Sequence, residues 1–483
     1  MKRPFISPAP TGEIALVCCS PENFHTIKDL DTTSNPSSNH KDLNIKEESL
    51  NVFNPQAFQS AIDCGFNVLM YPGSDLQAKW KSYTSMALNF CQRNGVKLIV
   101  NSPILNIRQT PLTKEYKKNW PKEFVEEFVN HKALGGWQLK DEPLYSAWHN
   151  VQDSEYVYDN YQTICGLDNN HIVFMNLAAD TKDKWIGNQS YENYLTEFDN
   201  KFHPALWTFD LYPVHYKGKT NEIVTDTTSF YTFLNIFSNK SKETNRPFWS
   251  YCLCLAHDKG ERNYPYATEG MLRFEAFSAL AFGAQGLVFW RYKQEYTVAE
   301  TTDLEKHPSG KIFFSSNEMG PLDLFGTKTP IWDNLKQVIS EIKGKNDYFY
   351  QCKCVDHIIA NGSGSTTELT GYGNLAMLKA HTKGVLITRI ETPDQNSKDQ
   401  YGNPIIHKYM VVVNSDPLAS QDFELLYQSS SSTSDNNNIV GTTPGIDTGL
   451  HPFKDTDDGN YDGSSEWTRH TLIPGGCYIW PIV

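Results

Sequence analysis

The first 345 or so residues alternate between short apolar runs and longer segments with helical spacing. The apolar runs predict eight buried strands, at residues 13–19, 66–71, 96–101, 135–143, 171–176, 206–212, 247–257 and 286–292. Helical patterns follow them, at 54–65, 81–92, 121–134, 156–165, 191–202, 228–238, 268–282 and 330–343. Eight alternating units of this kind are typical of a (β/α)8 TIM barrel, which belongs to the α/β class.

Beyond residue 347 the pattern changes to short alternating or β-rich runs, separated by Gly, Asn, Ser and Pro, with no convincing helix. These runs lie at residues 349–359, 375–380, 384–390, 407–413, 423–427 and 476–482. They predict a small all-β sandwich. We therefore predict a barrel domain over residues 1–346 and an accessory, structural sandwich over residues 347–483.

Charge and composition narrow the kind of ligand. The formal net charge is -13 and no Lys/Arg-rich run occurs, so the basic surface expected of a nucleic-acid or anionic-membrane binder is missing. No run of 18 apolar residues predicts a membrane span. Aromatic residues make up 13% of the chain, and surplus rings often line grooves that stack on sugars. We expect a neutral ligand and infer no obligate protein partner.

The sequence predicts no metal site and no cofactor. Most of the 10 cysteines lie within apolar runs, where a thiol behaves as a small hydrophobe, and no spacing resembles a zinc site. A Gly-rich phosphate loop and a G-x-S-x-G elbow are both missing from the sequence.

Polar and aromatic side chains cluster at the ends of the predicted strands. Catalytic groups of such barrels lie at the carboxyl ends of the strands, where all eight ends share one mouth. Mixed polar and aromatic side chains of this kind suit sugar recognition. The candidates in chain order are Tyr71, Asn101, Asp141, Glu142, Asn176, Asp210, Tyr212, His215, His257, Trp290 and Tyr292.

The fourth predicted strand carries two adjacent acids at its end. Gly135-Gly136 opens this strand and Pro143 stops it, directly after Asp141-Glu142. One interpretation is structural, with Asp141 as the cap of the following helix. The other is chemical, with Glu142 as a general acid. Successive strand residues point to opposite faces, so both carboxylates reach the mouth only if the strand bends there.

Four motifs resemble the glycoside hydrolase-like proteins of gut-bacterial polysaccharide-utilisation systems, distant relatives of the (β/α)8 clan of β-galactosidases and endo-β-glucanases. They are GGWQLKDEP on strand four, FDLYPVHY on strand six, RPFWSYCLCLAH on strand seven, and LRFEAFSALAFGAQGLVFWRY through strand eight. The resemblance implies a C-terminal β-sandwich. It also implies that Glu142 is the general acid/base and that Trp290 is the floor of a sugar subsite.

The sequence departs from that clan at strand seven, where the second carboxylate is expected. Residues 253–257 offer no acid there. Retaining glycosidases need two carboxyl groups about 5 to 5.5 Å apart, and inverting ones about 6.5 to 9.5 Å apart. Asp210, Glu261 and Glu295 are the possible substitutes, and Asp210 is the best placed because it ends a strand. Its alternative role is to accept a hydrogen bond from Tyr212 or from a sugar.

We therefore expect hydrolysis of O-glycosidic bonds in a neutral oligo- or polysaccharide, with Glu142 as acid and Asp210 as the second carboxylate. The remaining candidates would bind substrate, and His215 or His257 would contact the sugar or hold a carboxylate. The alternative is a non-catalytic carbohydrate-binding barrel. The segment MKRPFISPAPTGE lacks the apolar core of a signal peptide. We expect export to the periplasm or cell surface, with the signal segment absent from this sequence.

Overall fold

The computed structural model describes thirteen stretches of the chain. They are residues 5–19, 43–44, 54–71, 80–101, 120–149, 151–218, 220–257, 263–293, 297–298, 311–313, 319–323, 326–428 and 465–482.

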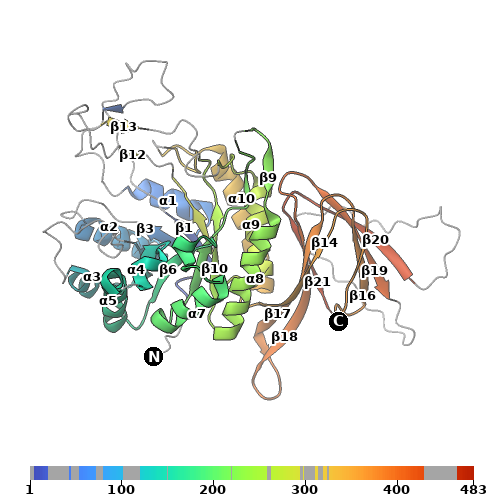
Figure 1. Ribbon diagram of the computed structural model, residues 1–483, viewed down its shortest axis with the longest axis horizontal. Helices are drawn as coiled ribbons and strands as arrows, with labels where there is room; N and C mark the ends of the chain where they lie inside the picture. The colour runs from blue at the N-terminus through green and yellow to red at the C-terminus, as the bar shows by residue number, and fades with distance from the viewer. Residues whose placement is uncertain are drawn as a thin grey trace. The chain divides into compact units, whose positions relative to one another are not determined.

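The eight predicted strands form a closed parallel barrel, so the TIM-barrel fold is confirmed (Figure 1). Around the barrel the order is β1-β3-β4-β5-β6-β7-β10-β11, and β11 pairs again with β1. The bounds are β1 Ala15–Cys19, β3 Val68–Tyr71, β4 Lys97–Val100, β5 Leu134–Asp141, β6 Ile172–Ala178, β7 Trp207–Asp210, β10 Phe248–Leu253 and β11 Gly286–Trp290.

Helices follow the barrel strands at each predicted place. The long ones are α1 Pro55–Cys64, α2 Trp80–Arg93, α3 Trp120–Phe128, α5 Val151–Leu167, α7 Tyr191–Phe202, α8 Thr227–Thr244, α9 Glu269–Ala281 and α10 Pro330–Gly344. Short helices that the pattern did not predict are α4 Tyr145–His149, α6 Asp183–Ile186 and α11 Asn346–Phe349. None of the helices described is both long and apolar enough to cross a membrane.

Short strands outside the barrel form two small antiparallel groups. One is the hairpin of β8 Val214–Tyr216 and β9 Ile223–Thr225. The other is a three-stranded sheet of β2 Leu43–Asn44, β12 Thr297–Val298 and β13 Lys311–Phe313.

The barrel interior is a packed core and not a pore. Inward-facing side chains alternate along each strand, such as Val17 of β1, Val68 and Met70 of β3, and Phe174 of β6. At the amino end, Phe5 packs edge-on against Trp249, with 6.3 Å between ring centroids. Apolar side chains therefore fill the amino end, which leaves the carboxyl end for polar groups.

The predicted sandwich is confirmed as two four-stranded antiparallel sheets (Figure 1). One has the order β14-β17-β18-β21, and the other β15-β16-β19-β20. The sequence pattern did not predict two of these strands, β15 and β20. The run predicted at 349–359 begins with the last residue of α11, and β14 forms the rest of it from residue 353. The bounds are β14 Lys353–Ala360, β15 Thr366–Glu368, β16 Leu375–Ala380, β17 Val385–Lys398, β18 Pro404–Asn414, β19 Gln421–Gln428, β20 Ser465–Leu472 and β21 Cys477–Pro481.

By its contacts, the chain forms two compact units. One holds residues 1–268 and 284–350, and the other holds residues 269–283 and 351–483. Helix α9 thus groups with the sandwich. A Cβ atom on Gly270 would lie 2.2 Å from the carbonyl oxygen of Pro417, so only glycine permits this approach. The domain boundary predicted between residues 346 and 347 stays a prediction. The two units are defined by contacts within each unit, and each consists of two separate segments of the chain.

The cysteines behave as buried apolar residues. Nine of the ten are buried and Cys477 is partly exposed. Burial raises the pKa of the Cys64 thiol to about 12, and it does the same for Cys91. Such thiols stay protonated at neutral pH and contribute packing.

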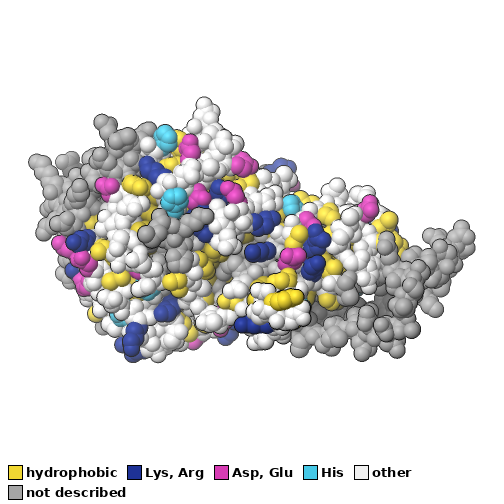
Figure 2. Space-filling view, turned by 90° about the horizontal axis from the view of Figure 1, so that it is seen from below, with side chains coloured by type: hydrophobic (Ala, Val, Ile, Leu, Met, Phe, Trp, Pro, Cys, Tyr) yellow, Lys and Arg dark blue, Asp and Glu magenta, His cyan; other side chains and the backbone are white. Residues whose placement is uncertain are grey.

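Charges of both signs are mixed on one face of the protein. Figure 2 shows one face, on which Lys and Arg side chains are interspersed with Asp and Glu side chains. On this face, neither sign forms the extended field that attracts a polyanion.

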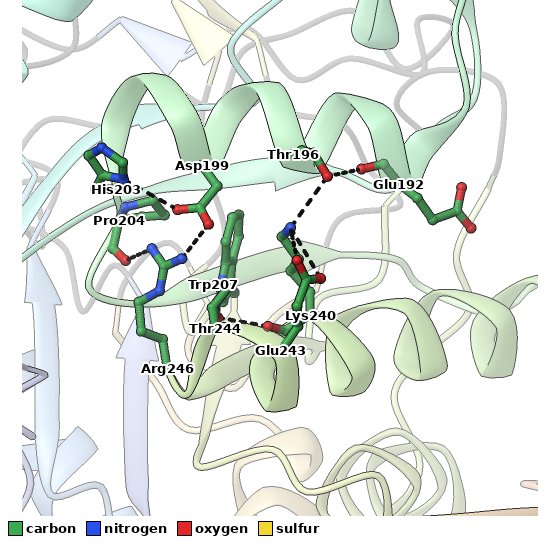
Figure 3. A network of polar contacts seen from close by, with 10 residues as sticks. All are labelled: Glu192, Thr196, Asp199, His203, Pro204, Trp207, Lys240, Glu243, Thr244 and Arg246. Atoms are coloured by element: carbon green, nitrogen blue, oxygen red, sulfur yellow. Dashed lines mark hydrogen bonds and ion pairs between the residues drawn. The ribbon is translucent and has the colours of Figure 1, made fainter. Parts of the chain in front are cut away.

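A polar network joins α7 to the end of α8 and fixes the start of β7 (Figure 3). Arg246 donates to the Asp199 carboxylate over 2.6 Å and to the Pro204 carbonyl over 2.7 Å. Its guanidinium also lies 5.1 Å from the ring centroid of Trp207, the first residue of β7. Because β7 ends at Asp210, these contacts hold the strand that carries a candidate catalytic group.

A buried carboxylate ties β5 to β6 near their amino ends. Asp168 is fully buried and accepts hydrogen bonds from the indole of Trp137 over 2.7 Å and from the imidazole of His171 over 2.8 Å. Burial acts to raise the pKa of Asp168. The hydrogen bonds from His171, Trp137 and the Asn170 backbone outweigh burial and lower it.

The Asp168→Ala variant is expected to lose about 3 kcal/mol of stability at pH 7, because a buried indole N–H and imidazole lose their acceptor. The lowered pKa means that this contribution is complete at neutral pH and is lost as pH falls through the folded-state pKa. Urea unfolding, followed by tryptophan fluorescence at pH 7 and pH 3, measures both effects. Asp63→Ala, on the exposed face of α1, is the control and should change stability by less than about 0.5 kcal/mol. An equal effect of both substitutions would contradict the assignment.

Candidate active site at the barrel mouth

Strand β5 bends where its two acids lie, as the chemical interpretation requires. Its pairing with β6 is irregular between Gln138 and Lys140. At Glu142 the backbone adopts the left-handed conformation with φ 41°, and the Glu142 N–H donates to the Asn176 carbonyl over 2.9 Å. A non-glycine residue in this region is uncommon and tends to occur at functional sites. The bend keeps Asp141 and Glu142 together at the carboxyl end of the barrel.

Asn176 of β6 joins the acids of two neighbouring strands. Its side-chain amide donates to Asp141 over 3.0 Å and to Asp210, at the end of β7, over 2.8 Å. Asn176 is fully buried, whereas Asp141 is exposed and Glu142 and Asp210 are partly exposed. Three carboxyl groups therefore share the mouth. The Asn176 amide is buried and turned toward the two carboxylates, and its contact with substrate stays a prediction.

Burial and mutual repulsion favour the protonated form of these acids. Burial raises the pKa of Glu142 to about 7, with further increases from Asp141 and Asp180 and a partial offset from Lys184. Burial also raises the pKa of Asp210 well above its ordinary value, as do Glu142 and Asp141, while the Asn176 hydrogen bond opposes them. A group that holds its proton near neutral pH can act as a general acid.

Four aromatic side chains form a wall beside the acids. Trp290, which ends β11, stacks with Tyr212 at 5.9 Å between centroids and meets His257 edge-on at 5.2 Å. His257 in turn stacks on Tyr264 at 4.6 Å. Trp290 stays partly exposed, while Tyr212 and His257 are nearly buried. The partly exposed Trp290 can present a ring face to a flat ligand, and the other rings support it.

A chain of hydrogen bonds crosses the mouth beneath these groups. Asn101 donates to Gln138 over 2.8 Å, and the Gln138 amide donates to the Tyr251 hydroxyl over 3.1 Å. Asn101 is partly exposed, so it remains available to a ligand, whereas Gln138 and Tyr251 are buried.

Two predicted site residues lie elsewhere. Tyr71 is fully buried, and its ring packs 5.8 Å from Phe58 of α1, because the inward positions of β3 are Val68 and Met70. Tyr292 is also fully buried. Its hydroxyl lies 3.0 Å from the Ser60 hydroxyl and accepts from the Trp332 indole over 2.7 Å. Both tyrosines pack toward the helices, and their contact with substrate stays a prediction.

The remaining candidates are less closely tied to the mouth. His215 lies on the β8–β9 hairpin, where its ring contacts the Tyr216 carbonyl over 3.0 Å. No described contact joins His215 to the acids. The two other substitutes for a second carboxylate, Glu261 and Glu295, lie outside the described residues.

Sequence reasoning missed Gln138, Tyr251 and Tyr264. A glutamine inside an otherwise apolar strand was a usable signal for Gln138, since buried amides need partners. Tyr251 and Tyr264 carried no comparable signal, because aromatic residues are equally common in barrel cores. Among the described residues, no group of three or more His, Cys, Asp or Glu side chains is arranged to hold a metal ion.

No family model and no curated protein matches the sequence. Solved structures with a similar fold include a GH42 β-galactosidase from G. stearothermophilus, with 8% identity, 99% of each chain covered and a TM-score of 0.49. Xylanase 10B from Thermotoga maritima has 10% identity over 70% of this chain and 98% of its own, with a TM-score of 0.40. A β-galactosidase from Marinomonas ef1 has 11% identity over 68% of this chain and 60% of its own, with a TM-score of 0.41.

These neighbours are glycoside hydrolases, the class that the sequence motifs resemble. At such identities and TM-scores, the likeness carries no conclusion about the substrate or the reaction of this chain.

The Glu142→Gln variant is expected to be more stable than wild type above pH 7, by about 3 kcal/mol. The raised folded-state pKa means that folding favours the protonated carboxyl. Wild-type stability therefore falls as pH rises from about 4.5 to about 7 and then levels off. Glutamine carries no charge and avoids this loss. Thermal unfolding at pH 4.5 and pH 8 measures the difference, which should be small at the lower pH.

Glu197→Gln is the matched control. Hydrogen bonds from Gln189 and Tyr145 lower the pKa of Glu197, so its removal should not stabilise the protein at pH 8. Equal stabilities of wild type and Glu142→Gln at pH 8 would refute the buried-acid assignment.

Proposed function

We propose that the protein is a glycoside hydrolase that cleaves O-glycosidic bonds in a neutral oligo- or polysaccharide. The observation that carries the proposal is the meeting of Glu142, Asp141 and Asp210 at the carboxyl ends of β5 and β7, where Glu142 has a pKa of about 7. A pair of carboxyl groups, one protonated and one ionised, is what most glycosidases use.

In this proposal Glu142 donates its proton to the glycosidic oxygen as the bond to the sugar breaks. Asp210 is the second carboxylate and acts on the sugar carbon, either directly or through a water molecule. Trp290 supports the apolar face of the sugar ring, and Asn101 is placed to bind a hydroxyl group. Asp141 adds negative charge that helps Glu142 to retain its proton.

A second candidate is a carbohydrate-binding protein without turnover. The observation that favours it lies after strand β10, where the clan would carry its second carboxylate. There, among the described residues 254–257, the chain places His257 against Tyr264 and Trp290 and carries no acid. This candidate predicts glycan affinity, with no hydrolysis by wild type or any variant.

Glu142→Gln is expected to reduce kcat/KM by about 10²- to 10⁴-fold on glycosides with poor leaving groups, since proton donation is lost. Aryl glycosides with acidic phenol leaving groups depart without that proton and should be affected much less. A screen of oligosaccharides and aryl glycosides, with wild type and Glu142→Gln side by side, measures this contrast. In wild type, kcat/KM should fall as pH rises through about 7, because Glu142 loses its proton.

Glu192→Gln, on the exposed surface of α7, is the control for the kinetic test and should match wild type. Activity that is unchanged by Glu142→Gln would remove the proposed acid. Glycan binding without turnover of any substrate would favour the second candidate.

Trp290→Ala is expected to raise KM, or the dissociation constant for a bound glycan, about tenfold, because the sugar loses its stacking surface. Isothermal titration or steady-state kinetics on the sugar found in the screen measures the change. The control is Tyr401→Ala in the sandwich, a highly exposed aromatic that should have no effect. Equal affinities of Trp290→Ala and wild type would exclude the platform role.

A further inference from the structure

We infer that the side-chain amide of Asn176 decides which carboxyl group at the mouth carries the proton. By donating to Asp141 and Asp210, it stabilises the ionised form of these two against their burial and so favours the proton on Glu142. The use of that proton in glycoside cleavage rests on the proposed function, but its location does not. Asn176 is in this sense a positioning residue.

The geometry of the amide carries the inference. An amide nitrogen has two N–H groups, and in Asn176 both point at carboxylate oxygens, 3.0 Å away on Asp141 and 2.8 Å away on Asp210. The side chain is fully buried, and its carbonyl oxygen has no hydrogen-bond partner among the described residues. The two carboxylates therefore set the orientation of the amide. A donor of this kind favours the ionised form of each acid that it contacts.

Glu142 lacks this assistance. Its contact with Asn176 runs through the backbone, from the Glu142 N–H to the Asn176 carbonyl, which fixes its place but not its charge. In the described part of the chain, no hydrogen bond reaches its carboxyl group. Burial and the neighbouring acids raise the pKa of both Glu142 and Asp210, and the Asn176 hydrogen bond counters this rise at Asp210 alone. The amide therefore favours the proton on Glu142, the acid without a donor.

The other ionisable groups around the cluster do not alter this distribution. Asp180 and Lys184 act on Glu142 with opposite signs. The surrounding tyrosines have pKa values raised by burial and stay neutral at the pH of interest. The neighbouring groups are Asp180, Lys184, Tyr191, Tyr194, Tyr212 and Tyr251.

Infrared difference titration tests the location of the proton directly. A protonated carboxyl has its own C=O band, and ¹³C labelling of all aspartates shifts an aspartate band without moving a glutamate band. Near pH 6 we expect wild type to show a band that Glu142→Gln removes and that aspartate labelling leaves in place. A wild-type band that moves with the aspartate label would overturn the inference without any Asn176 variant.

The Asn176→Ala variant tests the role of the amide. In this variant, part of the intensity of the protonated-carboxyl band should shift with the aspartate label, because Asp210 now carries some of the proton. That part should disappear in the Asn176→Ala/Asp210→Asn double variant. The apparent pKa of Glu142 should fall by about one unit as Asp210 takes up proton. Asn176→Leu, which fills the amide volume without a donor, replaces Asn176→Ala if that variant does not fold. A proton that stays wholly on Glu142 in the variant would refute the role.

Asn101→Ala is the matched control, because it removes an amide at the same mouth that donates to Gln138 and not to an acid. In Asn101→Ala, the C=O band of the protonated carboxyl should not shift when the aspartates are labelled. The titration needs no substrate, so a protein without glycosidase activity would still report the proton. Failure of the proposed function and failure of this inference are therefore distinguishable.

Discussion

The pairing of β1 with β3 on one side and with β11 on the other is the constraint on which the rest of the barrel depends. It closes the sheet, so no edge remains and every strand ends on a common rim. Strand ends as distant in the sequence as Asn101 and Trp290 are brought to one mouth by this closure. Apolar packing at the amino end, around Trp249 and Phe5, leaves the polar chemistry to the other end.

The mouth concentrates groups that repel one another. Three carboxyl groups in a partly buried setting cost folding free energy, and one amide with two N–H groups relieves only part of it. The left-handed backbone at Glu142 adds a further local cost. Costs gathered at one end of an otherwise well-packed barrel are what a site under functional constraint is expected to show.

Much of the fold could be predicted from the sequence, because buried parallel strands and amphipathic helices leave distinct periods. The candidate acids were found for the same reason, as carboxylates at strand ends are rare without a purpose. The sequence could not show that Tyr71 and Tyr292 pack toward the helices, because the period gives only the alternation of side chains, while the register of the barrel decides which face is inside. The sequence placed Asn176 at the end of its strand. Its hydrogen bonds to Asp141 and Asp210 join three neighbouring strands, and the pattern of one strand alone cannot predict them.

The grouping of α9 with the sandwich has a consequence for how this protein can change over evolution. The second unit is discontinuous in the chain, since residues 269–283 are separated from 351–483 by a barrel strand and a barrel helix. Gly270 meets Pro417 too closely for any side chain, so these distant segments must be inherited together. Recombination at a single point between the barrel and the sandwich would separate them. A sandwich exchanged as a cassette would therefore have to match α9 as well.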